Sequence, residues 1–226
     1  MLEGKHIQIK KPPYSGSNYF NHKRTFSIVL MAIVNSAAEF LMVDVDANGR
    51  LADADIFKNS KLCEKMETGE INLPEPQPVW DDTPIPYVFV ANDGFALQPN
   101  IMKPYSHSDL LSKEIFFNDR LSSLRMQAEN TFQSLAARFK VLNTTITLVP
   151  EKVRKIVLSC CYLHNFIKRE MDSVNSDTST TEIFDGKGFI DLEPTLSEHS
   201  TIEAQEIRNN LCEATYAQSQ LEFVSE

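Results

Sequence analysis

The sequence lacks any apolar run that could cross a membrane. The longest such run, residues 26–34, is about half the roughly 20 residues that a transmembrane helix requires. The first residues also lack the positive segment and following apolar segment of a secretory signal. We therefore expect neither a membrane protein nor a secreted one.

Cysteine is also scarce, and its spacing excludes a familiar class of site. The four cysteines, Cys63, Cys160, Cys161 and Cys212, are not spaced like the ligands of a zinc site. Two of them are adjacent within a helical pattern, where we interpret them as small core residues in a reducing compartment. We therefore predict no zinc site.

Basic residues are fewer than acidic ones, and the whole deficit lies in the C-terminal part of the chain. The net charge is −9. From residue 172 onward there are 12 acidic residues and two basic ones, Lys187 and Arg208. The first 171 residues carry 20 basic and 19 acidic residues, so their net charge is +1. A nearly neutral domain does not exclude a polyanionic partner such as nucleic acid.

Apolar and β-branched residues near the N-terminus predict three strands. Residues 6–9 alternate with polar neighbours and end at Lys10, Lys11 and two prolines, which stop a strand. Residues 26–34 and 39–45 are longer β-rich runs, and the short polar connection between them suits a hairpin. The last two strands are therefore expected to be antiparallel.

The middle of the chain is predicted to be irregular apart from one buried strand. A turn at residues 46–50 precedes Asp53, which can cap a short helix through Phe57. Residues 64–86 are rich in proline and lack periodicity, so we interpret them as a long excursion outside the core. The continuous apolar run 87–91 predicts a strand buried on both faces. It ends in polar residues, at the point where α/β folds place their chemistry.

A long amphipathic helix is predicted over residues 109–139. Its apolar stripe recurs at steps of three and four and comprises Leu121, Leu124, Ala128, Phe132, Leu135 and Phe139. Glu129 lies beside this stripe, one turn after Arg125. A glutamate in such a place is usually solvated or paired with an arginine, and only the context of a family favours a functional role.

The C-terminal part is predicted to contain a second long helix and a weakly structured tail. After a short extended link, residues 141–149, Pro150 opens a helix over residues 152–171. Residues 172–200 are rich in Ser, Thr and Asp and are expected to be largely disordered, before a weak helical pattern over 202–216 that could dock on the core. His164 is expected to be a core or boundary histidine rather than a catalytic one. The helix is expected to bury Val153, Ile156, Val157, Cys160, Leu163 and Ile167.

The order of these elements is that of an RNase H-like fold. We predict an α/β protein with a mixed sheet flanked by helices and a partly disordered acidic C-terminal tail. The domain is expected to cover residues 1–171, and the tail, with a candidate terminal helix, residues 172–226.

Eight local segments make the expectation specific. They are residues 3–7 (EGKHI), 15–21 (SGSNYFN), 26–30 (FSIVL), 48–50 (NGR), 102–105 (MKPY), 120–122 (RLS), 128–130 (AEN) and 163–166 (LHNF). Together and in this order they closely resemble the DDE endonuclease domain of PIF/Harbinger transposases and the nucleases derived from them. The resemblance covers roughly residues 1–170.

The resemblance implies a two-metal phosphodiesterase site. In such a family, three acidic side chains from the first strand, the end of a later buried strand and the long helix hold two divalent cations. One cation activates the attacking water or 3′-hydroxyl and the other stabilises the leaving oxygen. Magnesium or manganese suits oxygen ligands of this kind. Carried over residue by residue, the catalytic triad falls on Glu3, Asn92 and Glu129.

Two of these three positions depart from the family pattern, which has aspartate at both. Glu3 adds a methylene and displaces its carboxylate by roughly 1 Å, enough to disturb two-metal geometry. Asn92 is neutral, and one lost charge near a cation costs on the order of 4 kcal/mol, or about a thousandfold in metal affinity. Asp93 could replace it, giving Glu3, Asp93 and Glu129 as metal ligands. Since successive side chains of a strand alternate, this requires the strand to end in a turn there.

Three functions follow as hypotheses. The first is a transposase-derived DDE domain with weakened or lost cleavage of DNA; the second is an active metal-dependent endonuclease; the third is a non-enzymatic interaction module for protein or DNA. The basic residues that could contact DNA phosphates, or equally be solvated charges, are Lys5, Lys10, Lys11, Arg120 and Arg125.

Partners and location follow from the resemblance alone. The family carries a helical DNA-binding region before its first strand, whereas here that strand begins almost at Met1. We therefore expect DNA recognition to come from a separate Myb-like protein partner, in a chain that is either a truncated gene product or a co-opted remnant. The resemblance implies the nucleus, with the cytoplasm as a further location. The sequence does not indicate an oligomeric state.

Overall fold

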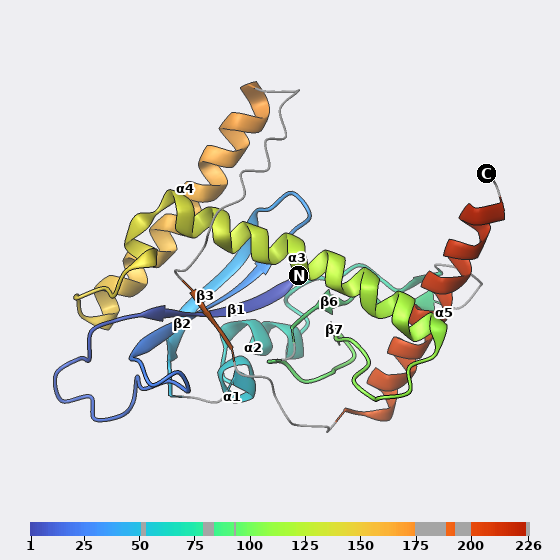
Figure 1. The fold of residues 1–226 in the computed structure, drawn as a ribbon, viewed down its shortest axis with the longest axis horizontal. Helices are drawn as coiled ribbons and strands as arrows, with labels where there is room; N and C mark the ends of the chain where they lie inside the picture. Colours follow the sequence, from blue (N-terminus) through green and yellow to red (C-terminus); the bar gives the residue numbers. More distant parts are fainter. Residues whose placement is uncertain (51–52, 79–83, 93, 175–188, 193–199, 225–226) are drawn as a thin grey trace.

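The structure, a computed structural model, describes residues 1–50, 53–78, 84–92, 94–174, 189–192 and 200–224 (Figure 1). Its centre is a four-stranded sheet in the order β3-β2-β1-β8, with every neighbouring pair antiparallel. The strands are β1 (Leu2–Gln8), β2 (Ser27–Val34), β3 (Phe40–Asn48) and β8 (Phe189–Asp191). The three predicted N-terminal strands are therefore confirmed, although β1 begins at Leu2 rather than His6.

The sheet carries helices on both faces, which confirms the predicted α/β fold (Figure 1). Strand β2 is buried on both sides because alternate residues point to different layers. Leu30 and Ala32 pack toward α3 (Ser112–Arg138) and α4 (Pro150–Val174). Met31 and Ile33 pack toward α1 (Asp53–Lys58) and α2 (Lys61–Glu67) on the opposite face.

The two long helices bury slightly different faces from those expected. On α3, Leu121, Ala128, Phe132 and Leu135 are buried as predicted, whereas Leu124 is 39% exposed. On α4, Val153, Val157 and Cys160 are buried, and Ile156 and Ile167 are half-buried. Leu163 is 49% exposed and His164 is buried in its place. At this point the buried face of α4 is therefore shifted by one residue from the predicted one, because His164 and Asn165 hydrogen-bond to the start of β3 and to the residues before it.

The excursion predicted over residues 64–86 is only partly irregular. Helix α2 extends to Glu67, and its buried Leu62 and Cys63 belong to the core. The Ser60 hydroxyl caps this helix by accepting a hydrogen bond from the Cys63 backbone N–H at 3.1 Å. The short strands β4 (Gln77–Pro78) and β5 (Pro84–Ile85) then pair antiparallel.

The strand predicted over residues 87–91 is shorter and more exposed than expected. Only β6 (Phe89–Val90) forms, half-buried and paired parallel with β7 (Ile101–Met102). Ala91 is fully buried and forms a parallel bridge to Leu2 at the start of β1. The prediction of a strand buried on both faces was therefore wrong, because the apolar residues of the run pack into two separate clusters. The end of the run still reaches β1.

The link predicted over residues 141–149 begins as a 3-10 helix, η1 (Lys140–Asn143), rather than as an extended segment. Ile146 then forms a parallel bridge to Ile9. A transmembrane helix is absent from the described part of the chain, since its long helices are too polar to span a bilayer.

Part of the predicted acidic tail is ordered in the structure. Strand β8 pairs with β1, and α5 (Ile202–Val224) packs against α3. Residues 175–188 and 193–199, where disorder was predicted, lie outside the described residues. The division of the chain at residue 171 stays a prediction.

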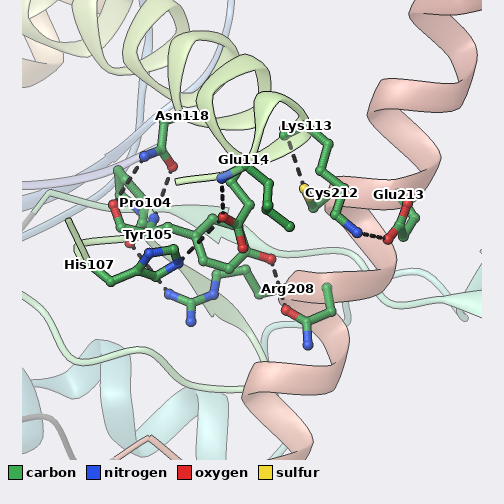
Figure 2. Close-up of polar contacts among 11 residues, drawn as sticks. Pro104, Tyr105, His107, Lys113, Glu114, Asn118, Arg208, Cys212 and Glu213 are labelled. Carbon is green, nitrogen blue, oxygen red and sulfur yellow. Dashed lines mark hydrogen bonds and ion pairs between the residues drawn. The ribbon is translucent and has the colours of Figure 1, made fainter. Parts of the chain in front are cut away.

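Helix α5 is attached to the domain by a polar network around Tyr105 (Figure 2). The Tyr105 hydroxyl donates to Asn209 Oδ1 at 2.8 Å, and the Arg208 guanidinium lies 4.1 Å from the Tyr105 ring centroid. Burial raises the pKa of the Tyr105 hydroxyl, so it remains a donor. Beneath this network, Ala204 and Cys212 pack with Phe117 and Leu121 of α3. The MKPY segment thus provides, through Tyr105, the polar contacts that hold α5 against the domain.

The LHNF segment explains how α4 is fixed to the sheet. Asn165 Oδ1 accepts from the Phe40 backbone N–H at 2.9 Å, and its Nδ2 donates to the Phe40 carbonyl at 2.8 Å. His164 Nε2 lies 3.1 Å from the Ala38 carbonyl oxygen. The amide of Asn165 therefore pairs with the edge of β3 as another strand would.

We expect Asn165→Ala to lower the free energy of unfolding by roughly 2 kcal/mol, because it leaves the buried Phe40 N–H and carbonyl without partners. Urea denaturation measures this loss. The control is Tyr162→Ala on the same helix, whose side chain is 68% exposed and whose effect should stay within about 0.5 kcal/mol. Equal losses in the two variants would contradict the role given to Asn165.

Candidate active site on the first strand

Two charged side chains of β1 point into the protein beneath α3. Glu3 and Lys5 alternate with Gly4 along the strand and share the face that carries Ile7 into the α3–α4 core. They are only 1% and 2% exposed, respectively. Charged groups so deeply buried need partners, because desolvation of an isolated charge is costly.

The Lys5 ammonium lies among three carboxylates that come from different parts of the chain. Its Nζ is 2.5 Å from Glu129 Oε1 on α3, 2.5 Å from Asp191 Oδ1 on β8, and 3.8 Å from Glu3 Oε1. Burial alone would lower the pKa of Lys5, but Glu3, Asp191 and Glu129 outweigh it and the pKa is raised. Lys5 is therefore a permanent cation at the centre of this group.

Glu3 is held from the other side by Asn92, the residue that follows β6 and Ala91. Asn92 Nδ2 donates a short hydrogen bond to Glu3 Oε1. Asn92 Oδ1 accepts from the Gly94 backbone N–H at 2.9 Å. This second bond fixes the orientation of the amide, so its nitrogen rather than its oxygen faces Glu3.

The environment of Glu3 favours its neutral form. Burial raises its pKa to about 7, the negative charge of Glu129 adds to the increase, and Lys5, the Gly4 backbone N–H and Arg125 oppose it. At neutral pH the Glu3 carboxyl is therefore protonated in a substantial fraction of the molecules.

The structure brings the three predicted triad residues into one group. Asn92 contacts Glu3 directly, and Glu129 joins them through Lys5. The proposed substitute ligand Asp93 lies outside the described residues. The convergence of β1, the end of the β6 segment and α3 is the arrangement that the resemblance implied.

The five predicted DNA contacts are distributed unevenly. Lys5 is buried within the group, and Arg125 is half-buried one turn before Glu129 and close enough to Glu3 to affect its pKa. Arg120 is exposed on α3, roughly 14 Å along the helix from Glu129, over the Phe116 ring. Lys10 and Lys11 are exposed beyond the far end of β1, roughly 20 Å or more from Glu3 along the strand.

Sequence reasoning missed Asp191, because its segment lies in a region expected to be largely disordered. The available signal was weak: Phe189, Ile190 and Leu192 form a short apolar run around one acidic residue. Such a run is too short to show a period. Its partner strand lies 186 residues earlier in the chain.

The described residues do not fit a divalent cation as they are arranged. Such a cation needs converging oxygen ligands, and no group of three or more His, Cys, Asp or Glu side chains in the described part of the chain could hold a metal ion. The Lys5 ammonium already binds the oxygens of Glu129 and Asp191. Asn92 presents an N–H donor toward Glu3, where a metal would require an acceptor.

Comparison with known proteins agrees with this geometry. The family described as "DDE superfamily endonuclease" matches residues 2–165. "Protein ALP1-like" from Arabidopsis thaliana is 26% identical over 211 residues, which cover 92% of this chain and 52% of that protein. "Putative nuclease HARBI1" from Mus musculus is 26% identical over 163 residues, which cover 71% of this chain and 43% of that protein.

The chain thus spans about half the length of the curated relatives it matches. No solved structure matches it. Because the family match covers most of the chain and includes Glu3, Asn92 and Glu129, the resemblance to Harbinger transposase-derived nucleases is confirmed, and the chain belongs to the DDE superfamily endonuclease family.

Proposed function

We propose that this chain is a transposase-derived DDE domain that binds the phosphate backbone of DNA and has lost efficient metal-dependent cleavage. The observation that carries the proposal is the hydrogen bond from Asn92 Nδ2 to Glu3 Oε1, which places a donor and a neutral group where the family uses a carboxylate. An amide nitrogen cannot ligate a hard cation such as Mg²⁺.

The charge of the site supports the same conclusion. Glu3 has a pKa of about 7 and is partly neutral, and the single positive charge of Lys5 offsets one of the two negative charges of Glu129 and Asp191. Two divalent cations need more negative charge than this group offers. Cleavage therefore lacks the electrostatic basis that the family reaction requires.

DNA binding is supported by the family and by two arginines of α3. Arg125 lies one turn before Glu129 and Arg120 lies further toward the start of the helix, and neither requires a metal to contact a phosphate. Location in the nucleus, or also in the cytoplasm, and a separate Myb-like DNA-binding partner stay predictions from the resemblance.

We expect Arg125→Ala to weaken binding of a duplex DNA by roughly fivefold and to reduce the salt dependence of binding by about one phosphate contact. Lys11→Ala is the matched control, since it removes one positive charge at the far end of β1, and it should change affinity less than about twofold. Fluorescence anisotropy at several salt concentrations measures both. Equal effects would show that the binding face does not include Glu129 and its neighbours.

Cleavage is tested by incubating the protein with supercoiled plasmid and Mg²⁺ or Mn²⁺. We expect no nicking above that of the Glu129→Ala variant. Nicking that disappears in Glu129→Ala would instead support an active endonuclease with Glu3, Asp93 and Glu129 as ligands. Absence of both nicking and DNA binding, with a protein partner retained in the presence of chelator, would support the non-enzymatic interaction module.

A further inference from the structure

Residues 189–192, here called the strap, lie alongside β1, the strand that carries Glu3 and Lys5, at the edge of the sheet. Phe189, Ile190 and Asp191 pair with Ile7, His6 and Lys5, respectively, of β1. The strap belongs to the most acidic part of the chain, which carries 12 acidic residues and two basic ones after residue 171. It therefore brings the negative charge of Asp191 next to Lys5 and the residues around it.

The strap is seated by small, separate contacts on both faces of the sheet. The Phe189 ring packs edge-on against Phe132 of α3, with centroids 5.7 Å apart. Leu192 lies over Gly4, where an added Cβ would be 2.3 Å from Leu192 Cδ1. The backbone pairing involves only three residues. Release of this segment would uncover Phe132 and Gly4, but the pairing of β1 with β2 and of β2 with β3 does not depend on it.

Asp191 approaches Lys5 from the solvent side. The Asp191 side chain is 76% exposed, whereas that of Lys5 is 3% exposed, and their Oδ1 and Nζ atoms are 2.5 Å apart. Glu129, the other close partner of Lys5, is 39% exposed and lies on α3. A ligand from solution that sought the Lys5 ammonium would have to take the place that the Asp191 carboxylate occupies.

We propose that the strap inhibits DNA binding, and that Asp191 stands in for a DNA phosphate on Lys5. A carboxylate and a phosphate both offer anionic oxygens to an ammonium at this distance. Release of the strap removes one negative charge from the binding face and leaves Lys5 able to bind a backbone phosphate of the duplex. This inference rests on the proposed DNA-binding function and adds a regulatory element to it.

The test compares Asp191→Asn with Glu206→Gln in the full chain. Both variants remove one negative charge from the acidic tail, but Glu206 is exposed on α5, away from Lys5. We expect Asp191→Asn to bind a 25-base-pair duplex about fivefold more tightly at 50 mM salt, with a salt dependence steeper by about one phosphate contact. Glu206→Gln should stay within twofold of the unmodified protein. Equal affinities of the two variants for the duplex would contradict the inhibitory role of the strap.

Amide hydrogen exchange provides a second measurement on the unmodified protein. Addition of the duplex should lower the protection of residues 189–192, because the strap leaves when DNA binds. A strand with a purely structural role would keep or gain protection, and that result would also overturn the inference. If neither the unmodified protein nor any variant binds DNA, both the proposed function and the inhibitory role of the strap are wrong. If the protein binds DNA and the protection of the strap does not fall, only the inhibitory role is wrong.

Discussion

The double variant Glu3→Asp/Asn92→Asp is expected to nick supercoiled plasmid in Mn²⁺, whereas the unmodified protein is expected not to. The Asp at position 92 replaces the amide donor by a carboxylate, and the Asp at position 3 withdraws its carboxylate by about one methylene. The added charge strengthens cation binding by on the order of 4 kcal/mol, or about a thousandfold.

A second consequence of this double variant concerns stability. The short contact between residues 3 and 92 becomes a contact between two carboxylates, which repel each other unless one is protonated or a cation lies between them. We therefore expect a lower melting temperature in EDTA than for the unmodified protein, and recovery when Mn²⁺ is added. Saturating Mn²⁺ at a hundredfold excess over its Kd would restore about 2.7 kcal/mol.

The control for nicking is the triple variant that also carries Glu129→Ala, which should be inactive. The control for stability is the same Mn²⁺ titration of the unmodified protein, which should leave its melting temperature unchanged. A double variant that neither nicks DNA nor gains stability from Mn²⁺ would show that Asn92 is not what prevents metal binding.

The second large effect is a pH dependence of stability that disappears in Glu3→Gln. Glu3 has a pKa of about 7 in the folded protein, against 4.5 for an ordinary glutamate. Between these values the folded state binds one proton more than the unfolded state, so the free energy of unfolding falls as the pH rises. Integrated up to pH 8, the loss amounts to about 3 kcal/mol.

Glu3→Gln cannot lose a proton, and its amide oxygen can still accept the hydrogen bond from Asn92. Its stability relative to the unmodified protein should therefore rise between pH 5 and pH 8 by about 2.5 kcal/mol. Urea denaturation at four pH values measures the difference, with Glu206→Gln as a control that should run parallel to the unmodified protein. Parallel curves for Glu3→Gln would show that Glu3 keeps an ordinary pKa.

The parts of the fold that were predictable are those with a strong local pattern. The β2–β3 hairpin follows from two β-rich apolar runs, and α3 and α4 follow from periodic stripes and from Pro150 at a helix start. The meeting of Glu3, Asn92 and Glu129 came from the resemblance to a family, because no spacing in the sequence relates positions so far apart.

The remaining features depend on contacts between distant segments. Lys5 was expected at the surface as a phosphate contact, but three carboxylates from β1, α3 and β8 allow it to be buried. The donor role of Asn92 depends on Gly94, whose N–H fixes the amide. Strand β8 is specified mainly by its fit against β1, and three residues in an acidic region carry too little local preference to indicate a strand.

The pairing of β1 with β8 has a consequence for the order of events on the ribosome. Strand β1 acquires β8 as a neighbour only after a long further stretch of the chain has been synthesised, since Lys5 and Asp191 are 186 positions apart. Contacts of such long range are slow to form. Until β8 has been synthesised, the nascent chain will therefore expose the edge of β1 that later pairs with β8, and chaperones that recognise extended backbone have that interval in which to act.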